Sequence, residues 1–157
     1  MKVNIKRLKK LSTIPTYGTD GAGCFDLYAC FDDVNSYEWI FYDSTNCNRF
    51  VEEHIVIPTG LSFEIPKGYC MLIFSRSGHG FKNNVRLSNC VGVIDSDYRG
   101  EVMVKLTQDS IDCDFTVRHG DKIAQGMIIP VDKVQFVLQD ELSDTERGSN
   151  GFGSTGD

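Results

Sequence analysis

The apolar and β-branched residues of this chain fall into short runs, and glycine, proline and asparagine turns separate them. Because no segment keeps a helical apolar period over several turns, we do not expect long helices. Many short runs divided by turn residues predict an all-β sandwich or barrel, and a jelly roll is the natural architecture. The expected strands are Val3–Lys6, Glu53–Ile57, Leu61–Ile65, Tyr69–Phe74, Glu101–Thr107, Asp114–Val117, Lys122–Ile129 and Val134–Leu138.

At 157 residues the chain is long enough to bury one core without disulfide bonds. Its basic opening, MKVNIKRLKK, lacks the apolar stretch of a signal peptide, and no run reaches transmembrane length. We therefore expect a cytoplasmic protein, in the host cytoplasm if a virus encodes it, with no membrane partner. The six cysteines form no CxxC pair and are expected to be reduced thiols.

The charge of the chain limits its ligands. The net charge of −6 argues against nucleic acid as a partner, because a polyanion needs a basic stripe. A small phosphate ligand needs only a few arginines and backbone amides, so this charge still allows one. The three histidines share no zinc-like spacing with a cysteine, and we expect no metal cage built by side chains.

Five clusters of the sequence combine polar residues with glycines. They are Gly21–Ala29, Ser75–Gly80, Gly92–Gly100 preceded by Asn89, Gly120–Met127, and Arg147–Asp157. Each of the first four also fits an ordinary turn or strand end, and the fifth also fits a solvated terminal tail. Arg76, Ser77 and Gly78 offer a guanidinium, a hydroxyl and an open backbone amide, which suit a phosphate. The tail adds hydroxyls, glycines and one aromatic ring, Phe152.

Taken in this order, the five clusters resemble the five motifs of the trimeric deoxyuridine triphosphatase (dUTPase) family, over about Gly21 to Gly156. The resemblance implies a homotrimer of distorted jelly rolls of the β-clip type, with active sites shared between subunits. It implies Mg²⁺-dependent hydrolysis of dUTP to dUMP and pyrophosphate. It also implies that the protein keeps uracil out of DNA and supplies dUMP for dTMP synthesis.

The resemblance implies roles for residues of the third cluster. Asp95 corresponds to the general base that activates the water attacking the α-phosphorus. Asn89 and the backbone of a Val91–Tyr98 hairpin correspond to the groups that read uracil, and Tyr98 to the ring beneath the sugar that excludes a 2′-hydroxyl. The other implied substrate-binding residues in this region are Gly92, Val93, Ile94 and Met103.

The resemblance also implies residues for the phosphates and the metal. The implied phosphate-binding residues are Arg76, Ser77, Gly78 and Gln125. Asp26 corresponds to the acid that holds Mg²⁺ through water, with the metal chelated mainly by the triphosphate. The implied substrate-binding residues of the tail are Arg147, Phe152, Gly153, Ser154 and Thr155, and Phe152 stacks on uracil.

The resemblance divides the chain into a jelly-roll domain, residues 1–146, and a mobile glycine-rich arm, residues 147–157, that closes over the active site. Three positions depart from the usual family pattern. Ser75 stands where proline is common, His79 where an apolar residue is common, and Gly126 where a larger apolar residue is usual. Residues 31–49 make the link between the first and second motifs longer than is typical of the family. We interpret this segment as an extra hairpin, a trimer contact, a site for a partner protein, or a plain surface loop.

Two other functions remain open at this point. A dCTP deaminase would share the fold and the phosphate motifs, but it needs a glutamate that activates water against cytosine, and Asp95–Tyr98 occupies that region. A jelly-roll regulatory protein would keep the nucleotide site as a switch and dock a partner at residues 31–49.

Overall fold

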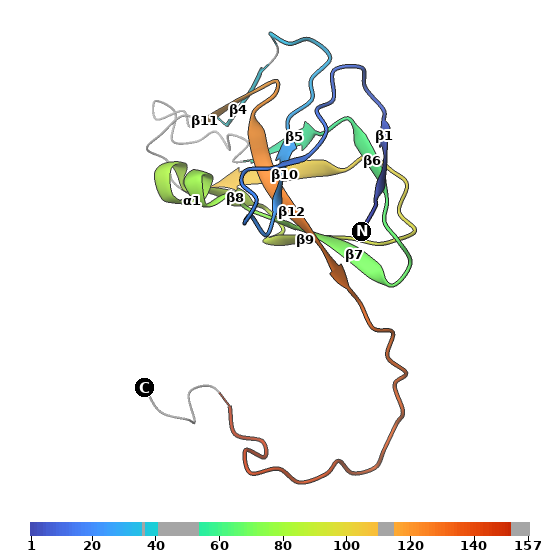
Figure 1. Ribbon diagram of the computed structural model, residues 1–157. Helices are drawn as coiled ribbons and strands as arrows, with labels where there is room; N and C mark the ends of the chain where they lie inside the picture. Colours follow the sequence, from blue (N-terminus) through green and yellow to red (C-terminus); the bar gives the residue numbers. More distant parts are fainter. Residues whose placement is uncertain (36, 41–53, 110–114, 152–157) are drawn as a thin grey trace.

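The computed structural model describes residues 1–35, 37–40, 54–109 and 115–151. This part of the chain consists mostly of short strands, with one short helix (Figure 1). The strands are β1 (Asn4–Arg7), β2 (Thr16–Tyr17), β3 (Phe25–Tyr28), β4 (Tyr37–Ile40), β5 (His54–Pro58), β6 (Leu61–Glu64), β7 (Tyr69–Phe74), β8 (Val85–Leu87), β9 (Val91–Ile94), β10 (Met103–Gln108), β11 (Phe115–Arg118) and β12 (Lys122–Pro130). The helix is α1 (Ser77–Asn83).

All the strand pairs described are antiparallel. The largest sheet has the strand order β2-β3-β12-β7-β9, and a second sheet has the order β5-β10-β8. Two further pairs, β1–β6 and β11–β4, complete the strand pairing in the described residues. Because β9 stands at the end of the largest sheet, one of its backbone edges faces away from β7.

The core forms where the buried faces of these sheets meet. Strand β10 shows the pattern: Val104 and Leu106 are buried, whereas Met103 and Lys105, which alternate with them, face outward. On β3, Phe25 and Leu27 point inward in the same way. Buried side chains from β3, β5, β6, β7, β8, β10, β11 and β12 belong to one cluster. The core is therefore built from alternate residues of these strands.

Most of the expected strands are confirmed. Tyr69–Phe74 has the expected bounds, and the runs near residues 3, 54, 61, 103, 115 and 122 form strands whose ends shift by one or two residues. Asp114 and Glu53, expected at strand ends, lie outside the described residues. The sequence interpretation missed the short strands β2 and β8, and it did not assign β4, which lies within residues 31–49 and pairs with β11. Residues 36 and 41–49 of that segment fall outside the described residues.

The expected strand Val134–Leu138 is wrong. Residues 131–139 form no strand, and from Val131 the chain runs away from the body in an extended path (Figure 1). In the part of the chain that the structure describes, no strand lies beside this segment, so its β-branched residues have nothing to pair with. Phe136 is 93% exposed and Leu138 is 97% exposed. The apolar pattern that predicted a strand is present, but no described strand pairs with it.

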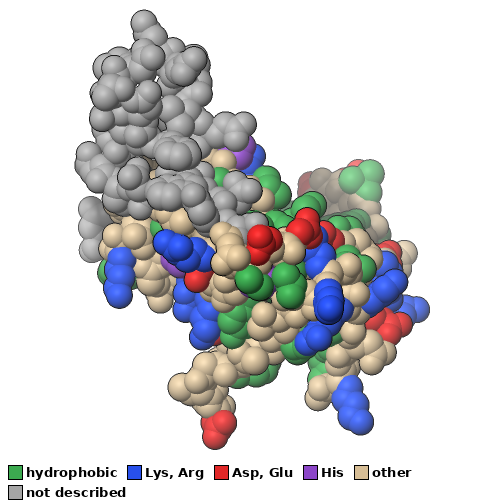
Figure 2. Space-filling model, turned by 90° about the horizontal axis from the view of Figure 1, so that it is seen from above, with side chains coloured by type: hydrophobic (Ala, Val, Ile, Leu, Met, Phe, Trp, Pro, Cys, Tyr) green, Lys and Arg blue, Asp and Glu red, His purple; other side chains and the backbone are tan. Residues whose placement is uncertain are grey.

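The face of the molecule seen in Figure 2 carries a mixture of side-chain types. Figure 2 shows acidic, basic and apolar side chains interspersed on the face in view. Among the described helices none is long and apolar enough to cross a membrane, since α1 has seven residues.

Gly126 has a structural reason to lack a side chain. It lies opposite Phe25 in the β12–β3 pair, and a Cβ at this position would approach Cε2 of the Phe25 ring to 2.6 Å. The ring cannot easily withdraw, because Phe25 is buried and packs edge-on against Tyr17 with a centroid distance of 5.9 Å. The departure from the family pattern at Gly126 is therefore matched by the ring that covers it.

We expect Gly126→Ala to lower the free energy of unfolding by about 1–3 kcal/mol, because the methyl group overpacks the site against the Phe25 ring. Denaturant unfolding monitored by circular dichroism measures the change. Gly18→Ala is the matched control, since a Cβ there meets nothing within 4 Å. Equal stabilities of the two variants would contradict the packing argument, and Gly126→Ala combined with Phe25→Leu should recover stability.

Candidate active site

Strand β12 brings polar residues from distant parts of the sequence onto one face of the largest sheet. Gln125 lies opposite Asp26 of β3 on one side and opposite Phe74 of β7 on the other. The register with β3 shifts between Lys122 and Ala124, and both Ile123 and Ala124 are buried. Such a bulge turns the residues before it to the other face. Lys122 and Gln125 therefore share a face with Asp26. In a regular strand their spacing of three positions would place them on opposite faces.

Asp26 is the centre of a charged cluster. Its carboxylate is 14% exposed, with Oδ2 at 2.7 Å from the Lys122 Nζ and Oδ1 at 3.4 Å from the Arg76 Nε. The hydrogen bond to Asp26, followed by the charge of that carboxylate, raises the pKa of Lys122 above its ordinary value of 10.5. Residues expected for the metal and for the phosphates thus lie in direct contact.

His79 anchors α1 to the sheet. Its Nε2 donates to the Lys122 carbonyl oxygen over 2.7 Å, and its ring meets that of Phe115 edge-on with centroids 5.1 Å apart. Nη1 of Arg76 donates to the same carbonyl over 3.3 Å. A leucine at position 79 would fill space against Phe115, but it would not bond to β12. The histidine therefore fixes the loop that carries Arg76.

The first of two cavities, here called the Arg76 cavity, lies where β7 ends and α1 begins. It has a volume of about 530 Å³. Its lining residues are Ser75, Arg76, Ser77, Gly80, Phe81, Asn84 and Gln125. Gly78 lies in the adjoining first turn of α1. Three of the four residues expected to bind phosphate thus line one cavity, and the fourth lies beside it.

Hydrogen bonds fix the walls of the Arg76 cavity. Gln125 Nε2 donates to the Ser75 carbonyl oxygen over 2.9 Å, and the Leu87 N–H donates to Ser75 Oγ over 2.9 Å. A proline at position 75 could not accept this second bond. Ser75 thus ties the end of β7 to β8, which gives this departure from the family pattern a structural reason.

The second cavity, here called the Asn89 cavity, has a volume of about 280 Å³. Its lining residues are Ile73, Leu87, Ser88, Asn89, Gly92, Val93, Ile94, Met103, Val104 and Lys105. Five of them, Asn89, Gly92, Val93, Ile94 and Met103, are residues expected to bind the substrate. The fold therefore gathers the expected nucleoside-binding residues of β9 and β10 around one space.

Tight backbone geometry shapes the Asn89 cavity. The Val91 N–H donates to the Asn89 carbonyl oxygen over 2.6 Å, and Cys90 between them has a φ of 61°. Gly92 lets β9 approach β7 closely, since a Cβ there would lie 3.3 Å from the Ile73 Cβ and 3.7 Å from the Asn89 Nδ2. A side chain at position 92 would therefore crowd Ile73.

Asp95 begins a turn directly beyond the Asn89 cavity. Strand β9 ends at Ile94, and the Tyr98 N–H donates to the Asp95 carbonyl oxygen over 3.2 Å. The stretch Val91–Tyr98 is thus a strand followed by a turn, whereas a hairpin was expected, because the chain leaves the turn for a strand of another sheet. Asp95 is exposed. The Tyr98 hydroxyl donates to the Glu101 carbonyl oxygen over 3.0 Å, and its ring covers Gly100.

Of the expected tail residues the structure describes only Arg147, and it lines neither cavity. The Arg147 Nε donates to the Asn150 carbonyl oxygen over 2.9 Å, so its contact is within the tail. Phe152, Gly153, Ser154 and Thr155 lie outside the described residues.

The sequence interpretation missed several residues of the site. Lys105 lines the Asn89 cavity two residues after Met103, so the alternation of side chains along β10 could have identified it. Lys122 was missed because a bulge, which the sequence does not reveal, turns it toward Asp26. Phe81 lines the Arg76 cavity and is 92% exposed, but no sequence pattern pointed to it.

The Lys122–Asp26 ion pair predicts a pH dependence of stability. Because the folded-state pKa of Lys122 is raised above 10.5, the contribution of the pair is fully present below that pH and is lost as the pH rises through the folded-state pKa. We expect the melting temperature of Lys122→Met to lie below that of the wild type, with a gap that narrows above pH 10.5. Calorimetry over this range measures the gap, with Lys67→Met as the control. A gap that stays constant would rule out the ion pair as its source.

Comparisons with known proteins identify the family of this chain. The dUTPase family model matches residues 40–156. Deoxyuridine 5′-triphosphate nucleotidohydrolases of Nautilia profundicola and Hydrogenobaculum sp. are 41% and 40% identical to this chain, and each match covers 99% of both sequences. A structure of the Staphylococcus bacteriophage 80alpha dUTPase with dUPNHPP superposes with a TM-score of 0.82, at 23% identity, over 99% of this chain and 98% of that one. The family match and these full-length relatives show that this chain belongs to the dUTPase family.

Proposed function

We propose that this protein hydrolyses dUTP to dUMP and pyrophosphate, with Mg²⁺, through attack of an Asp95-activated water on the α-phosphorus. The observation that carries the proposal is the Asn89 cavity, where the expected nucleoside-binding residues meet directly before the turn that holds Asp95. Family membership supports it, because the curated relatives bear the name of this activity.

The Asn89 cavity suits a pyrimidine base. As the end strand of its sheet, β9 has backbone N–H and C=O groups on its outer edge that no described strand pairs with. These groups and the Asn89 amide can bond to the imide edge of uracil, while Ile73 and Val104 provide apolar walls. We propose that this strand edge leaves no room for a 5-methyl group, which would favour uracil over thymine.

The turn after β9 supplies the general base, Asp95, and the residue that selects deoxyribose, Tyr98. Asp95 is exposed at the rim, where its carboxylate can accept a proton from water that lies near the α-phosphorus. Tyr98 is held by its hydroxyl at the Glu101 carbonyl, so its ring presents a fixed surface to the deoxyribose. A 2′-hydroxyl would meet that ring, and ribonucleotides would be rejected sterically.

The Arg76 cavity would hold the triphosphate. Arg76 can bind a phosphate with two donors, Ser77 and Gly78 add a hydroxyl and a backbone N–H, and Gln125 adds an amide. Before substrate binds, Asp26 and the Lys122 carbonyl orient the Arg76 guanidinium. This pre-orientation lowers the entropy lost when the phosphates are positioned for attack.

The residues present fit a magnesium ion that is chelated mainly by the triphosphate. No three His, Cys, Asp or Glu side chains gather at one place in the described ranges, so these residues form no cage. Each oxygen of Asp26 already faces a cation, which makes contact through a bridging water the fitting arrangement. When bound, the ion would neutralise phosphate charge. A phage phi11 dUTPase structure is described as showing the coordination of a structural Mg(II) ion.

We propose that the complete site forms in a homotrimer. The two cavities share no lining residue, so the nucleoside site of one copy can face the phosphate site of another. Apolar side chains on β9, β10 and the extended segment support association, since Val93, Met103 and Phe136 are exposed. In this arrangement residues 147–157 act as an arm that closes over the bound nucleotide, and residues 131–146 of the proposed domain 1–146 connect the sheets to the arm. The reaction would keep uracil out of DNA and supply dUMP for dTMP synthesis.

Asp95→Asn should lower the turnover of dUTP by about 10²–10⁴-fold, because the amide cannot take the proton from the attacking water. Pyrophosphate release with Mg²⁺ measures this, using dUTP, dTTP, dCTP and UTP as substrates. Asp97→Asn is the matched control and should keep most of the activity, since Asp97 faces a different cavity. Equal turnover of dUTP and dTTP, or a fully active Asp95→Asn variant, would contradict the proposal. Formation of a uracil nucleotide from dCTP would instead indicate a deaminase.

A further inference from the structure

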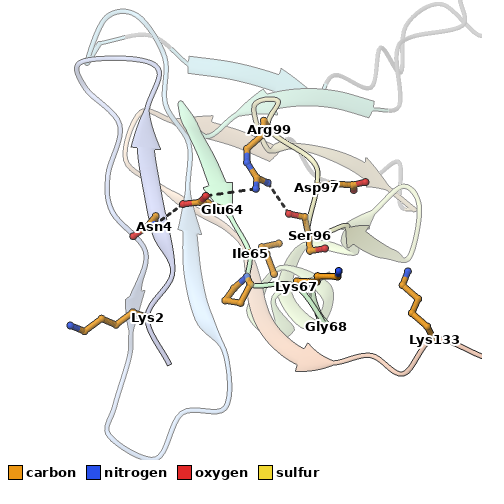
Figure 3. A pocket seen from close by; sticks show the side chains of 11 residues that line it. Lys2, Asn4, Glu64, Ile65, Lys67, Gly68, Ser96, Asp97, Arg99 and Lys133 are labelled. Carbon is orange, nitrogen blue, oxygen red and sulfur yellow. Dashed lines mark hydrogen bonds and ion pairs between the residues drawn. The ribbon is translucent and has the colours of Figure 1, made fainter.

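A third cavity, here called the Arg99 cavity, lies behind the turn that holds Asp95 (Figure 3). It has a volume of about 710 Å³. Its walls come from β1, from the end of β6 and the loop that follows it, and from the residues just after Asp95. Ser96, Asp97 and Arg99 of this turn line the cavity, whereas Asp95 does not.

The Arg99 side chain bridges two carbonyls of the turn. Its Nη1 donates to the Ser96 oxygen over 2.8 Å and to the Tyr98 oxygen over 3.0 Å. Together with the hydrogen bond from the Tyr98 N–H to the Asp95 backbone carbonyl oxygen, these contacts fix both ends of the turn. Asp95 and Tyr98 therefore cannot change their relative position without losing at least one hydrogen bond.

Strand β6 holds Arg99 from behind. The hydroxyl of Ser62, a buried residue, donates to the Arg99 carbonyl oxygen over 2.8 Å, which fixes the backbone. The guanidinium points toward Glu64, with Nη2 at 4.0 Å from Oε1, and Asn4 donates to the other Glu64 oxygen over 2.6 Å (Figure 3). The Glu64 contact joins two exposed groups and is weak on its own. The bonds to the turn carbonyls are the stronger constraint.

We propose that Arg99 is a positioning residue for dUTP hydrolysis: it holds the turn so that Asp95 reaches the attacking water and Tyr98 reaches the sugar. This inference rests on the function proposed above. The lining of the Asn89 cavity includes no residue of the turn, so base binding does not depend on Arg99. Loss of the Arg99 hydrogen bonds to the turn therefore lowers kcat and weakens the selection of deoxyribose, and it leaves the KM for dUTP nearly unchanged.

The test uses Arg99→Met, which keeps a long side chain and removes every donor, and Arg99→Lys, whose ammonium can replace part of the bridge. Lys67→Met is the matched control, because Lys67 lines the same cavity and no hydrogen bond of the described residues joins it to the turn. We measure kcat and KM for dUTP and for UTP, with melting temperatures to show that each variant is folded.

We expect Arg99→Met to lower kcat for dUTP about tenfold, the effect of about one lost charge-assisted hydrogen bond, with KM within about twofold. The preference for dUTP over UTP should fall, Arg99→Lys should lie between Arg99→Met and wild type, and Lys67→Met should match wild type. A folded Arg99→Met variant with wild-type kcat and sugar preference would overturn the inference. If that variant does not fold, an Arg99→Lys enzyme identical to wild type would overturn it. Wild-type protein without activity on dUTP would instead overturn the proposed function itself.

Discussion

Strand β12 runs through the middle of the largest sheet and hydrogen-bonds to β3 on one side and to β7 on the other. Its register sets Gln125 between Asp26 and the end of β7, and its bulge turns Lys122 to the same face. A slip of one residue would move Gln125 to the opposite face of the sheet. The charged cluster depends on this pairing, because Asp26, Lys122 and Arg76 come from segments that meet along β12. The same pairing brings Gln125 to the Arg76 cavity.

The three departures from the family pattern are each matched by a neighbour. Ser75 accepts the Leu87 N–H, His79 bonds to the Lys122 carbonyl, and Gly126 leaves room for the Phe25 ring. None of the three is a group proposed to react with the substrate. These positions fix the framework around the phosphate loop, which explains how they can change while the proposed reacting groups stay in place.

Much of the fold could be predicted from the sequence because burial on one face imposes a period of two on each strand. Val104 and Leu106 of β10 show this directly, and Pro58 and Pro130 stand at strand ends as expected. Val134–Leu138 was mistaken for a strand because local pattern does not say whether a pairing partner exists. The contacts of Lys122 and Arg99 were also missed, since a bulge and a turn decide where these side chains point. The five motifs, taken in sequence order, identified residues that line the Asn89 and Arg76 cavities. The distances between these residues and their hydrogen-bond partners could be obtained only from the structure.

The central claim is that dUTP is hydrolysed where Asp95 of one subunit meets Arg76 of another. Asp95→Asn and Arg76→Ala chains, each inactive alone, are mixed in equal amounts, unfolded, refolded together and assayed for pyrophosphate release from dUTP. Random assembly should restore about a quarter of wild-type activity, because each shared site then has even odds of an intact Asp95 and of an intact Arg76. Mixed oligomers, verified by mass spectrometry, that show no activity above the separate variants would contradict a site shared between subunits.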